Sequence, residues 1–199
     1  MKLKSFILTI IVIFMIFVTI NSKIFEKRKE INVLLLPSLP NPIAKEYVLI
    51  TSAGQSTEAY IINDVANKLM IHNYFMPQAK MSDLKGINTI VVVVGTSPLG
   101  EKLNRINVED EKKRVGELLK EAKKEKLVVI TVYMGGKERR DKSTDELLSI
   151  ICPQTNYLIG TKEANYDNFL SEAARSSKIP LTLINTVSDI IEPFSSAFR

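Results

Sequence analysis

Short apolar runs alternate with amphipathic helical patterns along most of this chain. The clearest runs are TIVVVV at 89–94 and LVVITVY at 127–133, in which nearly every position is apolar. Such runs are typical of parallel strands that are covered on both faces. The intervening stretch 108–126 instead places its apolar residues on one helical face and its charges on the other. The pattern therefore predicts an α/β domain.

Six strands and the helices between them follow from this pattern. We expect strands at 47–50, 73–76, 89–94, 127–133, 157–159 and 181–184. We expect helices at 61–70, 108–126, 143–152 and 166–175, and a last helical turn at 189–191. For the third of these helices we expect a capping box, with Ser143 as N-cap and Glu146 at the third helical position.

The predicted fold is a three-layer α/β domain with a mostly parallel sheet of five or six strands. Right-handed crossovers place helices on both faces of such a sheet. The second strand is short and weak, which fits an edge position and favours the flavodoxin-like, Rossmann-like order 2-1-3-4-5-6. A sheet without that strand is the alternative.

The first 22 residues form a separate apolar segment behind a basic start. Residues 6–20 are interrupted only by Thr9 and Thr19. As a helix they would span roughly 22 Å, short of the ~30 Å hydrocarbon core, and their neighbours would complete the span. The residues that follow lack the small side chains of a cleavage site. We therefore expect a signal-anchor helix in residues 1–22 that contacts the membrane through residues 5–21; a cleaved signal peptide is the alternative.

Residues 23–46 are predicted to be a tether, and 47–199 a single domain. The tether begins with a charged stretch and ends in a proline-rich one, which disfavours regular structure. Its apolar run 31–36 fits an edge strand or a contact with the membrane surface. A short basic N-terminus usually stays in the cytoplasm, so we expect a single-pass protein of the cell membrane with its domain extracytoplasmic. A cleaved signal would give a secreted domain instead.

The formal charge of +5 is concentrated at the N-terminus. Residues 1–30 carry six basic and two acidic side chains, whereas the rest of the chain carries 21 basic and 20 acidic ones. A protein that neutralises many phosphates needs a basic excess on its folded surface. Nucleic acid is therefore not an expected partner.

The single cysteine and the single histidine restrict the possible chemistry. Cys152 excludes an internal disulfide and a multi-cysteine metal site, and its apolar neighbours predict a buried core residue. His72 falls between the first helix and the second strand, at the opposite edge of the sheet from the loops that follow the strands. We expect no catalytic base there, no metal site and no cofactor.

Glycines and small hydroxyl residues follow several predicted strands. In an open parallel sheet, ligands bind at the carboxyl ends of the strands, where the strand order reverses. Backbone amides at a helix N-terminus attract anions, so these loops predict a small anionic ligand. The predicted ligand-binding residues are Ser52, Ala53, Gly54, Gln55, Ser56, Thr57, Gly95, Thr96, Ser97, Gly135, Gly136 and Lys137.

Nearby charges are predicted to be solvated. Arg139 and Arg140 lie beside Glu138 and Asp141, which can partly neutralise them. The charges of 108–126 fall at helix-neighbour spacings, which indicates a solvated surface.

Two enzyme motifs are weak in this chain. The segment GTSPLGEK at 95–102 imitates a phosphate-binding loop, but Glu101 stands at the lysine position and Pro98 removes an amide donor. Ser52 and Ser56 are candidate nucleophiles, yet the sequence indicates no base beside either. No catalytic residue is therefore predicted.

Four stretches resemble a family of exported bacterial proteins that is known as a domain of unknown function. They are VLITSAGQSTEAYIINDVANKL, TIVVVVGTS, MGGKERR and IPLTLINTVSDIIEP, and ITSAGQS is the most specific part. The resemblance covers about 47–193. It implies a Rossmann-like domain outside the cytoplasm, behind a signal or anchor, and implies no activity.

Two functions of different class remain open at this point. The first is a membrane-tethered extracytoplasmic domain that binds a small anionic ligand and serves a transporter or sensor as an accessory component. The alternative is a serine-dependent hydrolase or transferase that acts on a small ester, nucleoside or envelope fragment. A docking module for a protein partner is a third reading.

Overall fold

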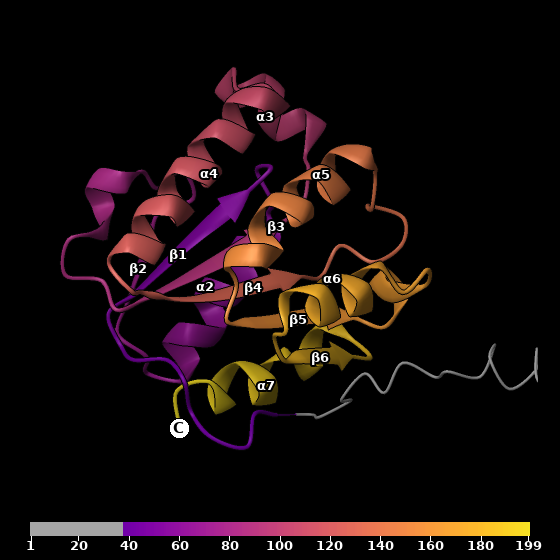
Figure 1. Cartoon of the computed structure of the whole chain (residues 1–199). Coiled ribbons are helices and arrows are strands. Elements are labelled where there is room, and N and C mark those ends of the chain that lie inside the picture. Colours follow the sequence, from indigo (N-terminus) through magenta and orange to yellow (C-terminus); the bar gives the residue numbers. More distant parts are fainter. Residues whose placement is uncertain (1–37) are drawn as a thin grey trace, which may run out of the picture. The chain divides into compact units, whose positions relative to one another are not determined.

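The computed structural model describes residues 38–199 of the chain (Figure 1). The predicted anchor in residues 1–22 and most of the predicted tether, including the run 31–36, lie outside the described residues. Among the described residues, no helix is both long enough and apolar enough to cross a membrane.

Six parallel strands form one sheet in the order β2-β1-β3-β4-β5-β6. The strands are β1 (Val48–Ala53), β2 (Asn73–Phe75), β3 (Thr89–Val94), β4 (Val128–Tyr133), β5 (Tyr157–Thr161) and β6 (Leu181–Ile184). Val48 pairs with Asn73 on one side and with Thr89 on the other. The predicted strand order, with a short second strand at the edge, is confirmed.

Helices cover both faces of the sheet (Figure 1). They are α2 (Glu58–Lys68), α3 (Pro98–Asn104), α4 (Val108–Lys124), α5 (Lys142–Ile151), α6 (Phe169–Ser177) and α7 (Ile191–Ser196), with short 3-10 turns between some of them. Apolar residues of α4, α5 and α6 form one buried cluster with the sheet, and those of α2 and α7 form another. Alternate residues of β3 enter the two clusters, since side chains along a strand point to opposite faces.

The structure corrects three local predictions. β1 continues through Ser52 and Ala53, because the Ser52 N–H and Oγ both donate to the Pro77 carbonyl and the strand stays paired. The predicted capping box of α5 is wrong, because Asp141 is the N-cap and its carboxylate accepts the Thr144 N–H at 2.8 Å. The short helix α3 was not predicted at all.

Cys152 and His72 lie where the sequence indicated. Cys152 is 1% exposed, and burial raises the pKa of its thiol to about 12. His72 is exposed and directly precedes β2, at the opposite edge of the sheet from the loops that follow the strands. Neither residue has the surroundings of a catalytic group.

Four helices end at a left-handed residue that is not glycine. At the end of α3 this residue is Arg105, which has a φ of 54°. Met70, Lys126 and Lys178 have φ angles of 56°, 59° and 55°. In each case the N–H of the next residue reaches back to a carbonyl in the last helical turn, which is the Schellman arrangement. Glycine is usual at this position because it has no Cβ to clash in the left-handed conformation.

Replacing Lys126 by glycine tests this assignment. Lys126→Gly should raise the free energy of unfolding by about 1 kcal/mol, because it relieves the left-handed strain. Lys124→Gly, in the last α-helical turn of α4, should lower it by about 1 kcal/mol. Urea unfolding measures both changes, and a loss of stability in both variants would contradict the assignment.

Candidate functional site

A hollow of about 660 Å³ opens at the carboxyl ends of β1 and β3. These two strands are neighbours, and the chain leaves them toward opposite edges of the sheet. The hollow therefore lies at the point where α/β sheets of this kind hold their ligands. Three segments line it: the loop after β1 with the start of α2, the loop after β2, and α3. The lining residues are Ser52, Gln55, Ser56, Thr57, Tyr60, Met76, Pro77, Gln78, Asp83, Ser97, Leu99, Gly100 and Leu103.

The loops after β1 and β3 lie in direct contact behind this hollow. The Gly95 N–H donates to the Ala53 carbonyl at 2.9 Å, and the Ser97 N–H donates to the Gly54 carbonyl at 2.9 Å. A Cβ on Gly54 would lie 2.7 Å from the Gly95 oxygen, and the φ of Gly54 is +86°. Only glycine allows the two loops to approach so closely.

A carboxylate from α4 accepts a hydrogen bond from a backbone amide in the loop after β1. Glu111 is 2% exposed, and its Oε1 accepts the Gly54 N–H at 2.9 Å. Arg114 pairs with Glu111 and donates to the carbonyls of Ser52 and Ala79. The prediction that the charges of this helix are solvated is wrong for this pair, because the first turns of α4 lie against the end of β1.

A second carboxylate, at the start of α2, binds a neighbouring hydroxyl and a guanidinium from the loop after β4. Glu58 is 8% exposed, and its Oε2 accepts the Ser56 hydroxyl at 2.6 Å. Its other oxygen pairs with the Arg139 guanidinium. Arg139 is exposed, as predicted, but it pairs with Glu58 across two loops instead of with the neighbouring Glu138 or Asp141. The amide of Gly54 and the guanidinium of Arg139 were both expected to be available to an external anion. In each case a carboxylate of the protein itself binds the group.

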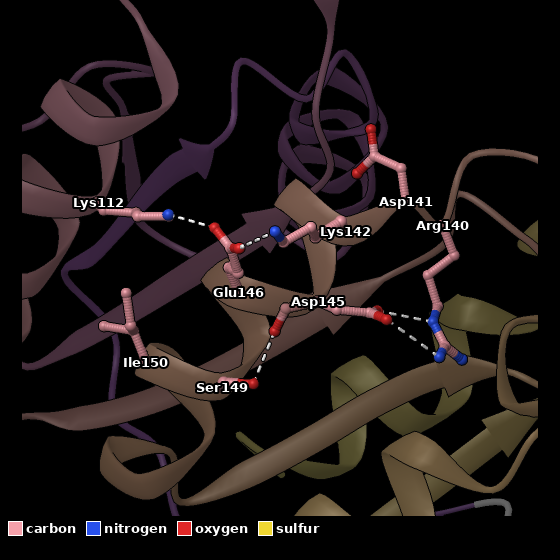
Figure 2. A pocket seen from close by; sticks show the side chains of 8 residues that line it. All are labelled: Lys112, Arg140, Asp141, Lys142, Asp145, Glu146, Ser149 and Ile150. Carbon is pink, nitrogen blue, oxygen red and sulfur yellow. Dashed lines mark hydrogen bonds and ion pairs between the residues drawn. The ribbon is translucent and has the colours of Figure 1, made fainter.

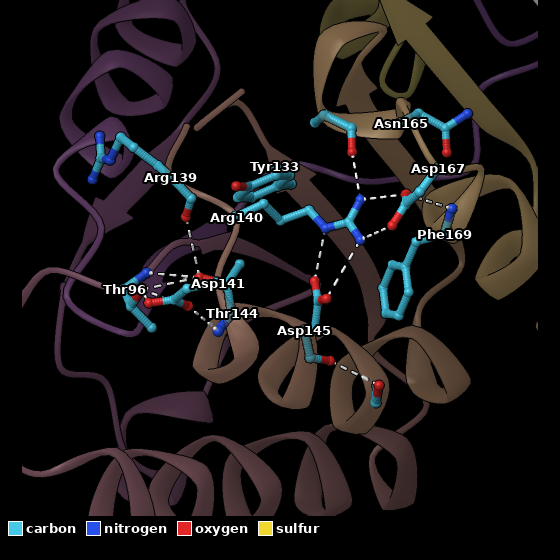
Figure 3. Close-up of polar contacts among 12 residues, drawn as sticks. Thr96, Tyr133, Arg139, Arg140, Asp141, Thr144, Asp145, Asn165, Asp167 and Phe169 are labelled. Atoms are coloured by element: carbon cyan, nitrogen blue, oxygen red, sulfur yellow. Dashed lines mark hydrogen bonds and ion pairs between the residues drawn. The ribbon is translucent and has the colours of Figure 1, made fainter. Parts of the chain in front are cut away.

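The Thr96 side chain joins the loop after β3 to the start of α5 (Figure 3). Its Oγ1 donates to Asp141 at 3.1 Å and lies 3.0 Å from the Thr144 Oγ1. Burial acts to raise the pKa of the Asp141 carboxyl, but the hydrogen bonds from Thr144 and Thr96 outweigh it and hold the pKa below its ordinary value. This polar contact belongs to the scaffold behind the hollow.

Arg140 is also part of the scaffold (Figure 3). Its side chain is 2% exposed and bonds Asp145, Asp167 and the Ala164 carbonyl. The guanidinium carbon lies 4.8 Å from the centre of the Phe169 ring. The hydrogen bond from Arg140 holds the pKa of the Asp167 carboxyl below its ordinary value. The prediction of a solvated Arg140 is wrong, because Asp145 of α5 and Asp167, in the turn before α6, both bind its guanidinium.

The loop after β4 does not reach the hollow. The Tyr133 hydroxyl donates to the Gly136 carbonyl at 3.0 Å, and the Lys137 Nζ lies 5.0 Å from the centre of the Tyr166 ring. Of the twelve predicted residues, five line the hollow: Ser52, Gln55, Ser56, Thr57 and Ser97. Ala53, Gly54, Gly95 and Thr96 form the contact behind it, and Gly135, Gly136 and Lys137 stand apart.

A second hollow of about 620 Å³ lies between α4 and α5 (Figure 2). Its charged groups bond one another: Lys112 pairs with Glu146, and Arg140 pairs with Asp145. Lys142 also approaches Glu146, at 3.8 Å. This surface is an ion-pair network between two helices, and it offers a ligand few polar groups that are not already engaged.

The first hollow has a different character. Among the described residues that line it there is no lysine or arginine, and Asp83 is its one charged residue. The Asp83 carboxylate already accepts the Lys80 N–H at 2.8 Å. Hydroxyl and amide groups form much of the lining, and Tyr60, Leu99 and Leu103 are 62%, 67% and 73% exposed around it. The site thus combines hydroxyl and amide groups with a larger apolar surface, and none of the described residues that line it is a cation.

The sequence contained a signal for part of this rim. Ser97 caps α3, since its Oγ accepts the Gly100 N–H, and Pro98 takes the first helical position. A capping residue followed by proline is a helix start, and Leu99 and Leu103 are spaced to share one face. The segment after β2, by contrast, had no local signal that would place it beside β1.

A family model, described as the domain of unknown function DUF6305, matches residues 45–198. This chain belongs to that family. No curated protein matches the chain.

Among solved structures, this DUF6305 domain is similar to AlinE4, an esterase of the SGNH-hydrolase family. The identity is 11%, the match covers 69% of this chain and 75% of that one, and the TM-score is 0.29. Two mutants of the same esterase match over the same shares, with identities of 10% and 11% and TM-scores of 0.30 and 0.31. Likeness at this level says nothing about activity.

Glu111 should be essential for the geometry of the site. Glu111→Ala leaves Arg114 and the Gly54 amide buried without their partner, and should lower the free energy of unfolding by about 3–5 kcal/mol. Glu109 lies two residues away on α4, is 80% exposed and forms a surface pair with Lys112. Glu109→Ala should cost less than about 1 kcal/mol. Chemical unfolding compares the two variants, and equal losses would contradict the role given to Glu111.

Proposed function

We propose that this protein is a membrane-tethered, extracytoplasmic binding domain that holds a small, uncharged polar molecule in the hollow at the ends of β1 and β3. The observation that carries the proposal is the position of that hollow together with its hydroxyl-rich lining. A volume of about 660 Å³ lies within the usual range for small-molecule sites.

The charge around the hollow favours an uncharged ligand over the predicted anion. The Gly54 amide is bonded to Glu111, and Arg139 is paired with Glu58. We count the segments that follow the six strands, each through the first turn of the next α-helix or, after β2, through the 3-10 turn Met81–Leu84. The short helix α3 is counted within the segment between β3 and α4. These segments carry fourteen acidic and eight basic side chains. Such an edge repels a free phosphate or carboxylate, whereas it does not oppose a neutral molecule.

The lining suits a molecule with one polar edge and one flat or apolar face. The hydroxyls of Ser56 and Thr57 donate to Glu58 and keep lone pairs that can accept from a ligand. The Ser97 Oγ accepts the Gly100 N–H and keeps its proton to donate. Gln78 supplies an amide. The Tyr60 ring, 62% exposed, stands at the rim and offers a surface for stacking. Saccharides and nucleosides combine these two features, so they are the ligand classes that we propose.

A binding role also agrees with what the loops lack. No histidine stands near the hollow, since His72, the one histidine of the chain, lies at the other edge of the sheet. A binding domain on a membrane tether would serve a transporter or a sensor as its accessory component. The tether and its extracytoplasmic side are inferred from the sequence of residues 1–46.

Ligand screening tests this proposal. A panel of neutral saccharides, nucleosides, phosphates and carboxylates is compared by thermal shift, and hits are measured by calorimetry. We expect a neutral compound to raise Tm, and Tyr60→Ala to weaken its binding by about tenfold through the loss of stacking. Ile61→Ala is the matched control, because Ile61 is the next residue on α2 and does not line the hollow. A panel in which only anions raise Tm would overturn the ligand class, and one without any hit would overturn the binding role.

One observation favours the hydrolase as a second candidate. The Ser56 Oγ donates to the Glu58 Oε2 at 2.6 Å, so this serine has a carboxylate in position to accept its proton. The Ser52 Oγ instead donates to the Pro77 backbone carbonyl, which is not a base. A hydrolase would cleave p-nitrophenyl esters, lose turnover in Ser56→Ala and keep it in Ser52→Ala. Equal turnover in Ser56→Ala and the unaltered protein would exclude this candidate.

A further inference from the structure

We propose that the amino edge of the sheet docks on a membrane surface that contains anionic lipid. We define the amino edge as the short segments that lead directly into the strands, with the last turns of the α-helices before them and the end of the described chain. Nine basic side chains lie there, and all are exposed: Lys45, Lys68, Lys85, Lys123, Lys124, Lys126, Arg175, Lys178 and Arg199. Three acidic side chains accompany them: Glu46, Glu121 and Glu125.

Most of these cations are not neutralised within the protein. Lys68 pairs with Asp64 at 2.7 Å, and Lys124 pairs with Glu121 at 2.7 Å. Arg199 donates to the Leu69 carbonyl. Within residues 38–199 the other six basic side chains of the amino edge form no ion pair. The domain is nearly neutral as a whole, so this edge carries a positive field that the total charge conceals.

Helix stability explains only part of this pattern. Lysine or arginine in a last helical turn complements the helix dipole, which accounts for Lys68, Lys123, Lys124 and Arg175. Lys45 and Lys85 lie outside the helices. At Met70, Lys126 and Lys178 the left-handed backbone would be less strained with glycine. The chain instead carries a long exposed side chain at each of these three helix ends, as it also does at Arg105, where α3 ends near the opposite edge.

Exposed apolar side chains stand among the cations. Met70 is 82% exposed, Tyr47 is 47% exposed and Ile43 is 38% exposed. The Tyr47 ring packs against His72, with the ring centres 4.6 Å apart. Lysines that surround aromatic and aliphatic side chains are typical of surfaces that rest on lipid headgroups. The cations meet the anionic headgroups while the apolar tips enter the interface.

The distribution of these groups favours lipid over an acidic macromolecule. The cations are mostly flexible lysines, spread along the whole edge from the start of β1 to the end of the described chain. Lipids move laterally to meet such scattered charges, whereas a folded partner needs preorganised ones. The described chain also enters the domain here, since the N–H groups of Ile43 and Ala44 donate to the Ala197 carbonyl. Docking at this edge would turn the opposite edge, with its hollow, away from the membrane.

Vesicle binding of residues 38–199 tests the proposal without the predicted anchor. This part of the chain contains all six strands and both apolar clusters, and a cooperative thermal transition verifies each variant. Cosedimentation compares phosphatidylcholine vesicles with vesicles that contain about one-third phosphatidylglycerol. We expect binding to the anionic vesicles alone, and its loss at high salt.

The variants separate a docking edge from general charge. Replacing Lys85, Lys126 and Lys178 together by glutamine should weaken vesicle binding about 100-fold, at about fivefold per lysine. The matched control replaces Lys102, Lys142 and Lys162, which are exposed at the opposite edge, and should weaken binding less than about threefold.

Met70→Ser should weaken binding severalfold and leave its salt dependence unchanged. Equal losses in the two triple variants, or equal binding to both kinds of vesicle, would overturn the proposal. Retention on polyglutamate without binding to vesicles would assign the edge to an acidic protein and overturn it as well.

Discussion

The buried carboxylate of Glu111 holds the carboxyl edge of this domain together. Glu111 accepts the N–H of Gly54. Its partner Arg114 donates to the carbonyl of Ser52, near the end of β1, and to the carbonyl of Ala79, in the segment after β2. Glycine at position 54 then lets the loop after β3 approach to direct hydrogen-bonding distance. A helix, two strands and two loops therefore share one polar junction. Each of its groups is removed from water and needs its partners, so the junction has little freedom to rearrange.

This junction limits which polar groups are left free beside the neighbouring hollow. Loops at the end of a central parallel strand usually present free amides to a phosphate or carboxylate. Here Glu111 and Glu58 are bonded to the groups that would otherwise attract one. The remaining surface consists of hydroxyls, amides and an apolar rim. The carboxyl edge of this sheet thus satisfies these amides and cations internally, which agrees with the neutral ligand that we propose.

The fold was predictable from the sequence, whereas the site was predictable only in part. The strands and helices were predictable from local patterns, because a few residues are enough to recognise an apolar run such as 89–94 or an amphipathic helix. The alternation of strands and helices then gives the strand order. The contact between Glu111 and Gly54 joins residues 57 positions apart, and the bond between Arg140 and Asp167 spans 27. No local pattern distinguishes these side chains from solvated ones. Predicting the position of the hollow required only topology, but predicting its chemistry required knowing which charges are internal.

The uniform direction of the strands has an electrical consequence. All six strands point the same way, and three of the helices that return the chain, α2, α4 and α6, carry acidic residues in their first turns and basic residues in their last turns. A domain of almost no net charge thereby acquires a large permanent dipole moment. In solution it will rotate as it nears any charged surface, so that cation-exchange and anion-exchange resins each meet a different end of the same molecule.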